Sequence, residues 1–176
     1  RPKVRKAVLI TAPHTSNWDF VWMILAAWYF DFKLSWLGKD SLFAGALGGL
    51  LKALGGIAVD RSAAHNLVEQ IAQEYHRRDS LFLGIPPEGT RKYREYWKSG
   101  FYYIAVEAGV PVIPTLLDYG NRKIGLGPMM VLTGDVKSDM DAFRVFYAGA
   151  EGKFPEKTGL IRLKGEDQEV IELRAS

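Results

Sequence analysis

A histidine and an aspartate five positions apart, His14 and Asp19, are the residues of this sequence best suited to proton transfer. On a regular helix five residues correspond to a rotation of about 140°, which would turn the two side chains apart. They can meet if His14 lies in a loop and Asp19 in the first turn of a helix. Asp19 would then accept from the imidazole Nδ1–H and leave Nε2 free to take a proton, which predicts a general base with its orienting carboxylate. The alternative is a structural His–Asp contact at a helix capped by Ser16 or Asn17.

Two further segments place charged residues directly after short apolar runs that are typical of strands. Pro87 to Arg91 follows the run from Leu81 to Ile85, and a glycine turn at that place exposes backbone N–H groups. The guanidinium of Arg91 adds a planar fork suited to phosphate oxygens. Gly56 to Arg61 repeats the arrangement, with an Asp–Arg pair where the next helix is expected to begin. Each segment by itself is better explained as an ordinary solvated turn or helix start than as a phosphate-binding site.

The elements that position these segments alternate between strands and helices along the chain. Strands are predicted at Ala7–Thr11, Lys33–Leu37, Ile57–Val59, Leu81–Ile85 and Val112–Leu117, and a hairpin at Lys123–Thr133. Helices are predicted from Phe20, where the apolar run indicates a buried helix, and at Leu42–Leu54, Arg61–Arg78, Phe101–Glu107 and Asp139–Ala148, the last with a partial capping box at Ser138 and Asp141. The alternation predicts an α/β fold in one domain, residues 1–176, with a mostly parallel central sheet and helices on both faces. Because ligands bind at the carboxyl ends of such strands, one cleft is expected to hold all of the motifs.

The amino-acid composition narrows the chemistry that the chain can perform. No cysteine is present, which excludes disulfides, thiolate metal sites and a thiol nucleophile and is compatible with a reducing cytosol. Neither a G-x-S-x-G elbow nor an H-E-x-x-H cluster occurs, so no serine nucleophile, metal or cofactor is expected. The net charge of +3 favours acidic partners such as anionic lipid surfaces, acidic carrier proteins and phosphorylated small molecules. Nucleic-acid binding through the basic and aromatic run from Arg91 to Lys98 is an alternative, but no nucleic-acid motif accompanies it, so no nucleic acid is expected as a partner.

The apolar runs of the sequence bear on membrane binding. The longest, Phe20 to Phe30, has eleven residues, whereas a spanning helix needs roughly 20. Leu42 to Leu54 is nearly uncharged and is expected to be either a helix buried against the sheet or, if partly exposed, a segment that enters the headgroup region of a membrane. The sequence starts at Arg1 rather than Met, so an anchor before it stays open. The charged tail after Gly165 is expected to be peripheral.

In their order and spacing, four segments resemble the motifs of the glycerolipid acyltransferases, the family that includes the 1-acylglycerol-3-phosphate acyltransferases. His14 and Asp19 match the H-x4-D motif of that family, and Pro87 to Arg91 matches its E-G-T-R motif. Gly56 to Arg61 is similar to a further motif of the family, and Val110 to Pro114 is similar to its V-P-I/V-x-P motif. The first motif is weak alone, but the pair with E-G-T-R about seventy residues later is specific.

The resemblance runs from about Ala12 to Pro114. Three residues beside the motifs, Pro13, Pro86 and Lys92, differ from those that many members carry. Because these departures lie around the motifs and not in them, they leave the identity of the acceptor open more than the reaction.

The resemblance implies a glycerol-3-phosphate acyltransferase-like fold and direct transfer of an acyl group without a covalent enzyme intermediate. His14 would deprotonate the acceptor hydroxyl, which attacks the thioester of acyl-CoA or of an acyl-carrier protein, and Asp19 would orient His14. The acceptor would be a phosphorylated lysolipid or glycerol phosphate. Its phosphate would be bound by Lys39, Arg61 and Arg91, beside a turn shaped by Glu88, Gly89 and Thr90.

The resemblance also implies a cytoplasmic enzyme of phospholipid biosynthesis or remodelling that is peripheral on the cytoplasmic face of an anionic membrane. Two other readings of the motifs stay open. A thioesterase or other hydrolase would use the same thioesters with water and would need no phosphate site. A non-catalytic, peripheral lipid-binding module would use the His14–Asp19 pair only as a helix cap.

Overall fold

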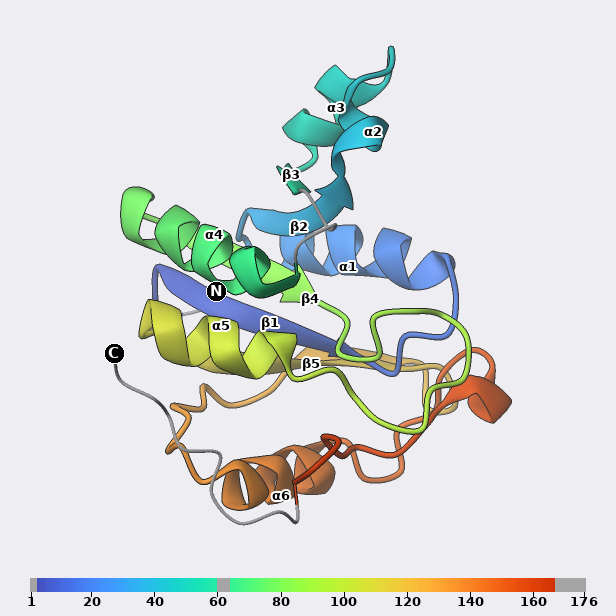
Figure 1. Ribbon diagram of the computed structural model, residues 1–176. Helices are drawn as coiled ribbons and strands as arrows, with labels where there is room; N and C mark the ends of the chain where they lie inside the picture. Colours follow the sequence, from blue (N-terminus) through green and yellow to red (C-terminus); the bar gives the residue numbers. More distant parts are fainter. Residues whose placement is uncertain (1–2, 60–63, 167–176) are drawn as a thin grey trace.

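The computed structural model describes residues 3–59 and 64–166 of the 176-residue chain, which form one sheet with helices on both of its faces (Figure 1). Six strands lie in the order β3-β2-β4-β1-β5-β6. Their bounds are β1 Lys6–Ala12, β2 Leu34–Lys39, β3 Gly56–Val59, β4 Leu81–Ile85, β5 Val112–Asp118 and β6 Lys123–Leu126. β1 to β5 are parallel to one another, and β6 is antiparallel to β5. The expected α/β fold with a mostly parallel sheet is therefore confirmed.

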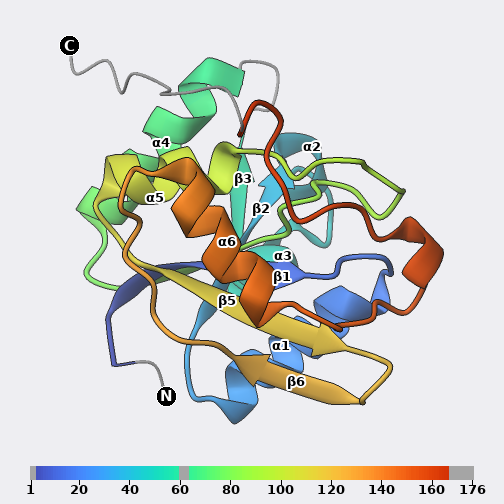
Figure 2. The same ribbon diagram turned by 90° about the horizontal axis from the view of Figure 1, so that it is seen from below.

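The helices cover the two faces of the sheet unequally. Their bounds are α1 Trp18–Tyr29, α2 Asp40–Phe43, α3 Gly48–Ala53, α4 Ala64–Arg77, α5 Gly100–Ala108 and α6 Val136–Phe146, with a short 3₁₀ helix, η1, at Pro155–Lys157. On one face α4, α5 and α6 pack over Val8 and Ile10 of β1 (Figure 2). On the other face α1 packs over Leu9 of the same strand through Met23 and Ala27. Successive residues of β1 thus point to opposite faces, as the pleat of a strand requires.

The outer side of α1 contradicts the expectation of a fully buried helix. Residues three and four apart on a helix lie on the same side, and here one such series is apolar and exposed to solvent. It consists of Trp18, Val21, Trp22, Leu25, Trp28 and Tyr29, which we call the outer face of α1. Within residues 3–59 and 64–166, neither α1 nor any other helix combines the length and the apolar character needed to cross a bilayer.

The segment expected as one loose helix at Leu42–Leu54 forms two short helices, α2 and α3. Three of its five leucines are not packed against the sheet, since Leu42, Leu47 and Leu50 are each more than half exposed. Phe43 points back to the sheet and contacts the ring of Trp36 on β2, with ring centroids 5.8 Å apart. Of the two expectations for this segment, the buried helix is therefore wrong and the exposed arrangement is found.

Two predictions beyond β5 need correction. β6 pairs with β5, and the residues after it also turn to β5, through a Gly127 N–H that donates to the Pro114 carbonyl and an isolated bridge at Met130, so the predicted hairpin at Lys123–Thr133 is wrong. α6 begins at Val136 rather than at Asp139. The N-cap of the helix is Asp135, whose side chain accepts from the Ser138 N–H. The predicted capping residue, Ser138, therefore lies inside the helix.

The carboxyl ends of three neighbouring strands gather the segments with polar residues. β1 lies between β4 and β5, and all three are parallel. The segments that follow these strands start at Pro13, Pro86 and Tyr119, and they therefore lie at one edge of the sheet. β2 ends at the same edge with Lys39, beside β4.

Candidate active site

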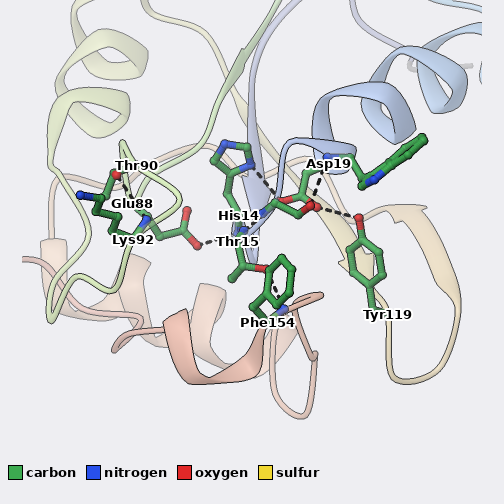
Figure 3. Close-up of polar contacts among 10 residues, drawn as sticks. His14, Thr15, Asp19, Glu88, Thr90, Lys92, Tyr119 and Phe154 are labelled. Carbon is green, nitrogen blue, oxygen red and sulfur yellow. Dashed lines mark hydrogen bonds and ion pairs between the residues drawn. The ribbon is translucent and has the colours of Figure 1, made fainter.

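The structure brings His14 and Asp19 together at this edge (Figure 3). His14 lies in the loop after β1, and Asp19 lies in the first turn of α1, where Asn17 makes no side-chain cap and the Ser16 hydroxyl instead accepts from the Trp18 N–H. The Nδ1 atom of His14 is 3.1 Å from Oδ2 of Asp19. The ring is turned so that an Nδ1–H would not be aligned with that oxygen, and such contacts often tighten only in the complex with substrate. Figure 3 shows the second ring nitrogen turned away from Asp19.

The Asp19 carboxylate is fully buried and has three donors besides His14. Its Oδ2 accepts from the backbone N–H groups of Thr15 and Ser16, each at 2.8 Å, and its Oδ1 accepts from the Tyr119 hydroxyl at 2.7 Å. Burial alone would raise the pKa of Asp19, but the close contact with His14 and the hydrogen bonds from Tyr119 and the Ser16 backbone lower it below its ordinary value. Asp19 is therefore an ionised acceptor that is fixed in orientation.

Tyr119 is a site residue that sequence reasoning missed. It is one hundred positions from Asp19 and belongs to none of the motifs. The available signal was its place directly after β5, at the carboxyl end of a central strand. Burial and the neighbouring carboxylate raise the pKa of Tyr119, so its hydroxyl remains a donor to Asp19.

Replacing Tyr119 with phenylalanine is expected to lower the free energy of unfolding by about 1.5–3 kcal/mol at pH 7, the usual worth of a hydrogen bond to a charged group. The pKa of Asp19 should rise because one of the bonds that lower it is lost. A depressed carboxylate pKa contributes stability that is lost as the pH falls through it, so the difference between the two proteins should shrink below the ordinary Asp pKa. Urea unfolding between pH 3 and pH 8 measures this. Tyr29→Phe, which removes an exposed phenol, is the matched control, and an equal loss in both variants would contradict the assignment.

Glu88 holds the loop of His14 from the other side. Its side chain is buried, and Oε1 accepts from the His14 backbone N–H at 3.0 Å. Among the residues that the structure describes, Oε2 has no hydrogen-bond partner. Burial raises the pKa of Glu88, and the nearby Asp19 carboxylate raises it further, while backbone N–H groups offset part of the effect. Glu88 therefore does more than shape its turn, since it ties the E-G-T-R segment to the histidine.

We expect Glu88→Gln to stabilise the protein at neutral pH. The amide keeps an oxygen for the His14 N–H but carries no charge that burial penalises. Because the native state of the wild type binds the proton more tightly than the unfolded state, its stability falls as the pH rises above the ordinary Glu value. The melting temperature of the variant should exceed that of the wild type at pH 8 by about 2–4 °C for each kcal/mol regained. The gap should close by pH 4, and a variant that is less stable at every pH would contradict this reasoning.

The turn from Pro86 to Arg91 has the conformation that its glycine allows. Gly89 has a φ of +66°, which L side chains rarely adopt. A methyl group added there would lie 2.8 Å from Cδ of Lys98, so the stem of that lysine runs directly over the turn. The Thr90 hydroxyl accepts from the Lys92 N–H at 3.3 Å. The turn is therefore bordered by cations, and Lys98 is one that sequence reasoning did not select.

The structure describes two of the three cations that were predicted to bind the phosphate. Arg91 is exposed at the end of the turn after β4. Lys39 is exposed at the end of the neighbouring strand β2. Arg61 and the Asp60 that precedes it lie outside the described residues. The remaining described residues include no group of three His, Cys, Asp or Glu side chains placed as metal ligands.

Residues late in the chain also support the loop of His14. The Phe154 N–H donates to the Thr15 hydroxyl at 3.2 Å (Figure 3), and the Tyr119 N–H donates to the carbonyl of Glu151 at 2.8 Å. A methyl group added to Gly152 would lie 2.8 Å from the side chain of Thr15, so the segment passes the loop closely. The site is therefore built from both ends of the sequence.

The motifs and their geometry agree with comparisons to known proteins. The family model described as Acyltransferase matches residues 2–118, which contain β1 to β5 and the His14–Asp19 pair. The chain belongs to this acyltransferase family. The match confirms the resemblance to glycerolipid acyltransferases.

Several curated relatives of this acyltransferase chain are named 1-acyl-sn-glycerol-3-phosphate acyltransferase. The protein of Haemophilus influenzae is 30% identical over 131 residues, which cover 70% of this chain and 52% of that protein. The proteins of Salmonella typhimurium and Escherichia coli are each 29% identical over 122 residues, which cover 65% of this chain and 48% of each relative. The chain thus spans about half the length of the curated relatives that it matches. No solved structure matches it.

Proposed function

We propose that this chain transfers a fatty acyl group from an acyl thioester to a hydroxyl of a phosphate-bearing lipid precursor, in phospholipid biosynthesis or remodelling. The observation that carries the proposal is the contact of His14 with a buried, ionised Asp19. Membership of the acyltransferase family and the names of the relatives support the same reaction. The donor is acyl-CoA or an acyl-carrier protein, and the acceptor is a lysolipid phosphate or glycerol phosphate.

In the proposed reaction His14 acts as a general base through Nε2. It takes the proton of the acceptor hydroxyl while the acceptor oxygen attacks the thioester carbonyl. The new C–O ester bond forms, the C–S bond breaks, and the leaving thiolate takes the proton back from the imidazolium. Asp19 faces the opposite nitrogen, Nδ1, and stabilises the positive charge that His14 carries between the two transfers.

The phosphate of the acceptor is proposed to bind at the turn after β4. Gly89 lets the backbone of that turn come close to a ligand, and Arg91 supplies a guanidinium that can hold two phosphate oxygens. Lys39 and Arg61 are proposed as further cations. The phosphates of acyl-CoA or the acidic surface of a carrier protein would meet the same basic edge of the sheet.

The experiment that tests this function supplies the chain with a radiolabelled acyl thioester and a panel of acceptors, and identifies each product by mass. We expect an ester product with glycerol phosphate or a lysolipid phosphate and little product with the dephosphorylated acceptor. A parallel reaction without acceptor measures hydrolysis. Acyl release that does not depend on any acceptor would identify a thioesterase, and lipid binding with no turnover would identify a non-catalytic module. Both outcomes would overturn the proposal.

A further inference from the structure

The outer face of α1 is an apolar surface that the structure leaves in solvent. α1 has 12 residues, and its inward residues Met23 and Ala27 pack on the sheet. On the opposite side, the exposed fractions rise toward the end of the helix, from 42% at Leu25 to 67% at Trp28 and 84% at Tyr29. A soluble protein gains nothing from exposing such a continuous series of large apolar side chains, so this face is expected to contact a partner.

The exposed leucines of α2, α3 and the residues between them belong to a segment that packs on β2 beside α1. The ring of Trp36 on β2 contacts Phe20 of α1 on one side and Phe43 of α2 on the other, with centroid distances of 5.1 and 5.8 Å. The three rings thus pack α1 and α2 against the same residue of β2. We call the outer face of α1 together with Leu42, Leu47 and Leu50 the lipid face.

Two features of the lipid face point to a bilayer as its partner. Three of its residues are Trp and one is Tyr, the side chains that are most enriched where membrane meets water. Beside it lies a cluster of cations on aromatic rings, in which Lys153 Nζ is 5.5 Å from the Trp18 ring and Lys157 Nζ is 4.0 Å from the Phe154 ring. Asp31 and Asp40 are exposed at the borders of the face, so the attraction to anionic headgroups is expected to come from these two lysines together with the exposed Lys52 of α3.

We propose that the lipid face is the surface by which this chain binds an anionic phospholipid bilayer, with α1 lying in the headgroup region. Trp18 is followed directly by Asp19, and the Phe154 N–H binds the loop of His14 through Thr15. The site of acyl transfer therefore lies beside the bound membrane, and its lipid product can enter the bilayer without crossing water. The inference rests on the proposed function for this last step, but the binding itself can be measured without turnover.

The test is co-sedimentation of the 176-residue chain with vesicles of phosphatidylglycerol and with vesicles of phosphatidylcholine. The wild type should bind phosphatidylglycerol more tightly, and salt should weaken the binding. Leu25→Glu with Trp28→Glu should lower the partition coefficient roughly 100-fold, because two apolar anchors are lost and two negative charges added. Lys153→Gln with Lys157→Gln should lower binding to phosphatidylglycerol roughly tenfold or more and change binding to phosphatidylcholine little.

The matched control is Val131→Glu with Val145→Glu, which makes the same charge change at exposed valines outside the lipid face. It should keep most of the wild-type binding, because Val145 lies on α6, which packs on the face of the sheet opposite to α1, and screening weakens repulsion over such a separation. If Leu25→Glu with Trp28→Glu melts early, Tyr29→Glu at the most exposed position replaces it. Equal binding by the wild type and the lipid-face variant would overturn the inference. The inference would also be overturned if the wild type did not bind vesicles but formed a dimer that the variant cannot form, because the face would then contact a second copy of the chain.

A readout with a detergent-dispersed acceptor separates this inference from the proposed function. The lipid-face variant should turn over such an acceptor at the wild-type rate, because Leu25 and Trp28 lie away from the His14–Asp19 pair. If vesicles bind as expected but no acceptor is acylated by any variant, the proposed function fails and the lipid face stands. If acceptors are acylated but vesicle binding does not depend on this face, the proposed function stands and the lipid face is wrong.

Discussion

Replacing His14 with alanine is expected to lower acyl transfer by roughly 10²- to 10⁴-fold, the usual contribution of a positioned general base. The fold should persist, because His14 lies in the loop after β1 and belongs to neither hydrophobic cluster of the core, and its backbone N–H can still donate to Glu88. The rate is measured with saturating thioester and a phosphorylated acceptor, and the melting temperature is measured in parallel. A well-folded variant with near-normal turnover would end the proposed mechanism.

Asp19→Asn is the companion variant that separates the base from its orientation. We expect a somewhat smaller loss of turnover than for His14→Ala, because the histidine remains but its preferred tautomer is lost. We also expect a loss of stability, because Asp19 accepts from three donors besides His14. An amide has only one acceptor oxygen, so its NH₂ group must face at least one of those donors. His14→Ala should show no comparable loss of stability.

Most of the sheet and the contact of His14 with Asp19 could be predicted from the sequence, because local signals determine them. β4 has the bounds that its apolar run and the following prolines predict. α5 ends where Gly109 adopts a positive φ, as expected of a helix C-cap. The contact of His14 with Asp19 follows from a loop and a helix start that are only a few residues apart. In each case the residues that decide the structure are neighbours in the chain.

The rest of the site could not be predicted because it depends on contacts between distant residues. Two hydrogen bonds join segments that no local pattern relates. One runs from the Tyr119 hydroxyl to Asp19, and the other from the His14 N–H to Glu88. The exposure of the outer face of α1 could not be predicted either, because an apolar run of this length is found both in buried helices and in helices that contact a partner. β6 pairs with the strand that precedes it, β5, although the sequence of β6 also suits a hairpin with the residues that follow it. Such choices are made by tertiary packing and not by the local sequence.

Replacing Arg91 with alanine is expected to weaken binding of the phosphorylated acceptor by roughly 10- to 150-fold, the range for losing a hydrogen bond to a charged group. The KM for the acceptor should rise, and the KM for the thioester should change little. Arg91→Lys should recover only part of the affinity, because an ammonium lacks the planar fork that holds two oxygens. Initial rates with each substrate varied in turn measure both constants.

The matched control for Arg91 is Arg94→Ala, which removes the same charge from an exposed position of the same loop. A general loss of positive charge would weaken the acceptor equally in both variants and would vanish at high salt. A specific contact predicts that Arg91→Ala alone raises the acceptor KM, and that much of the effect survives at high salt, because a direct hydrogen bond is screened less than a distant charge. If an acceptor without phosphate were used equally well by the wild type and by Arg91→Ala, the turn after β4 would not be the phosphate site. The reaction would then keep its base at His14 but would require a different class of acceptor.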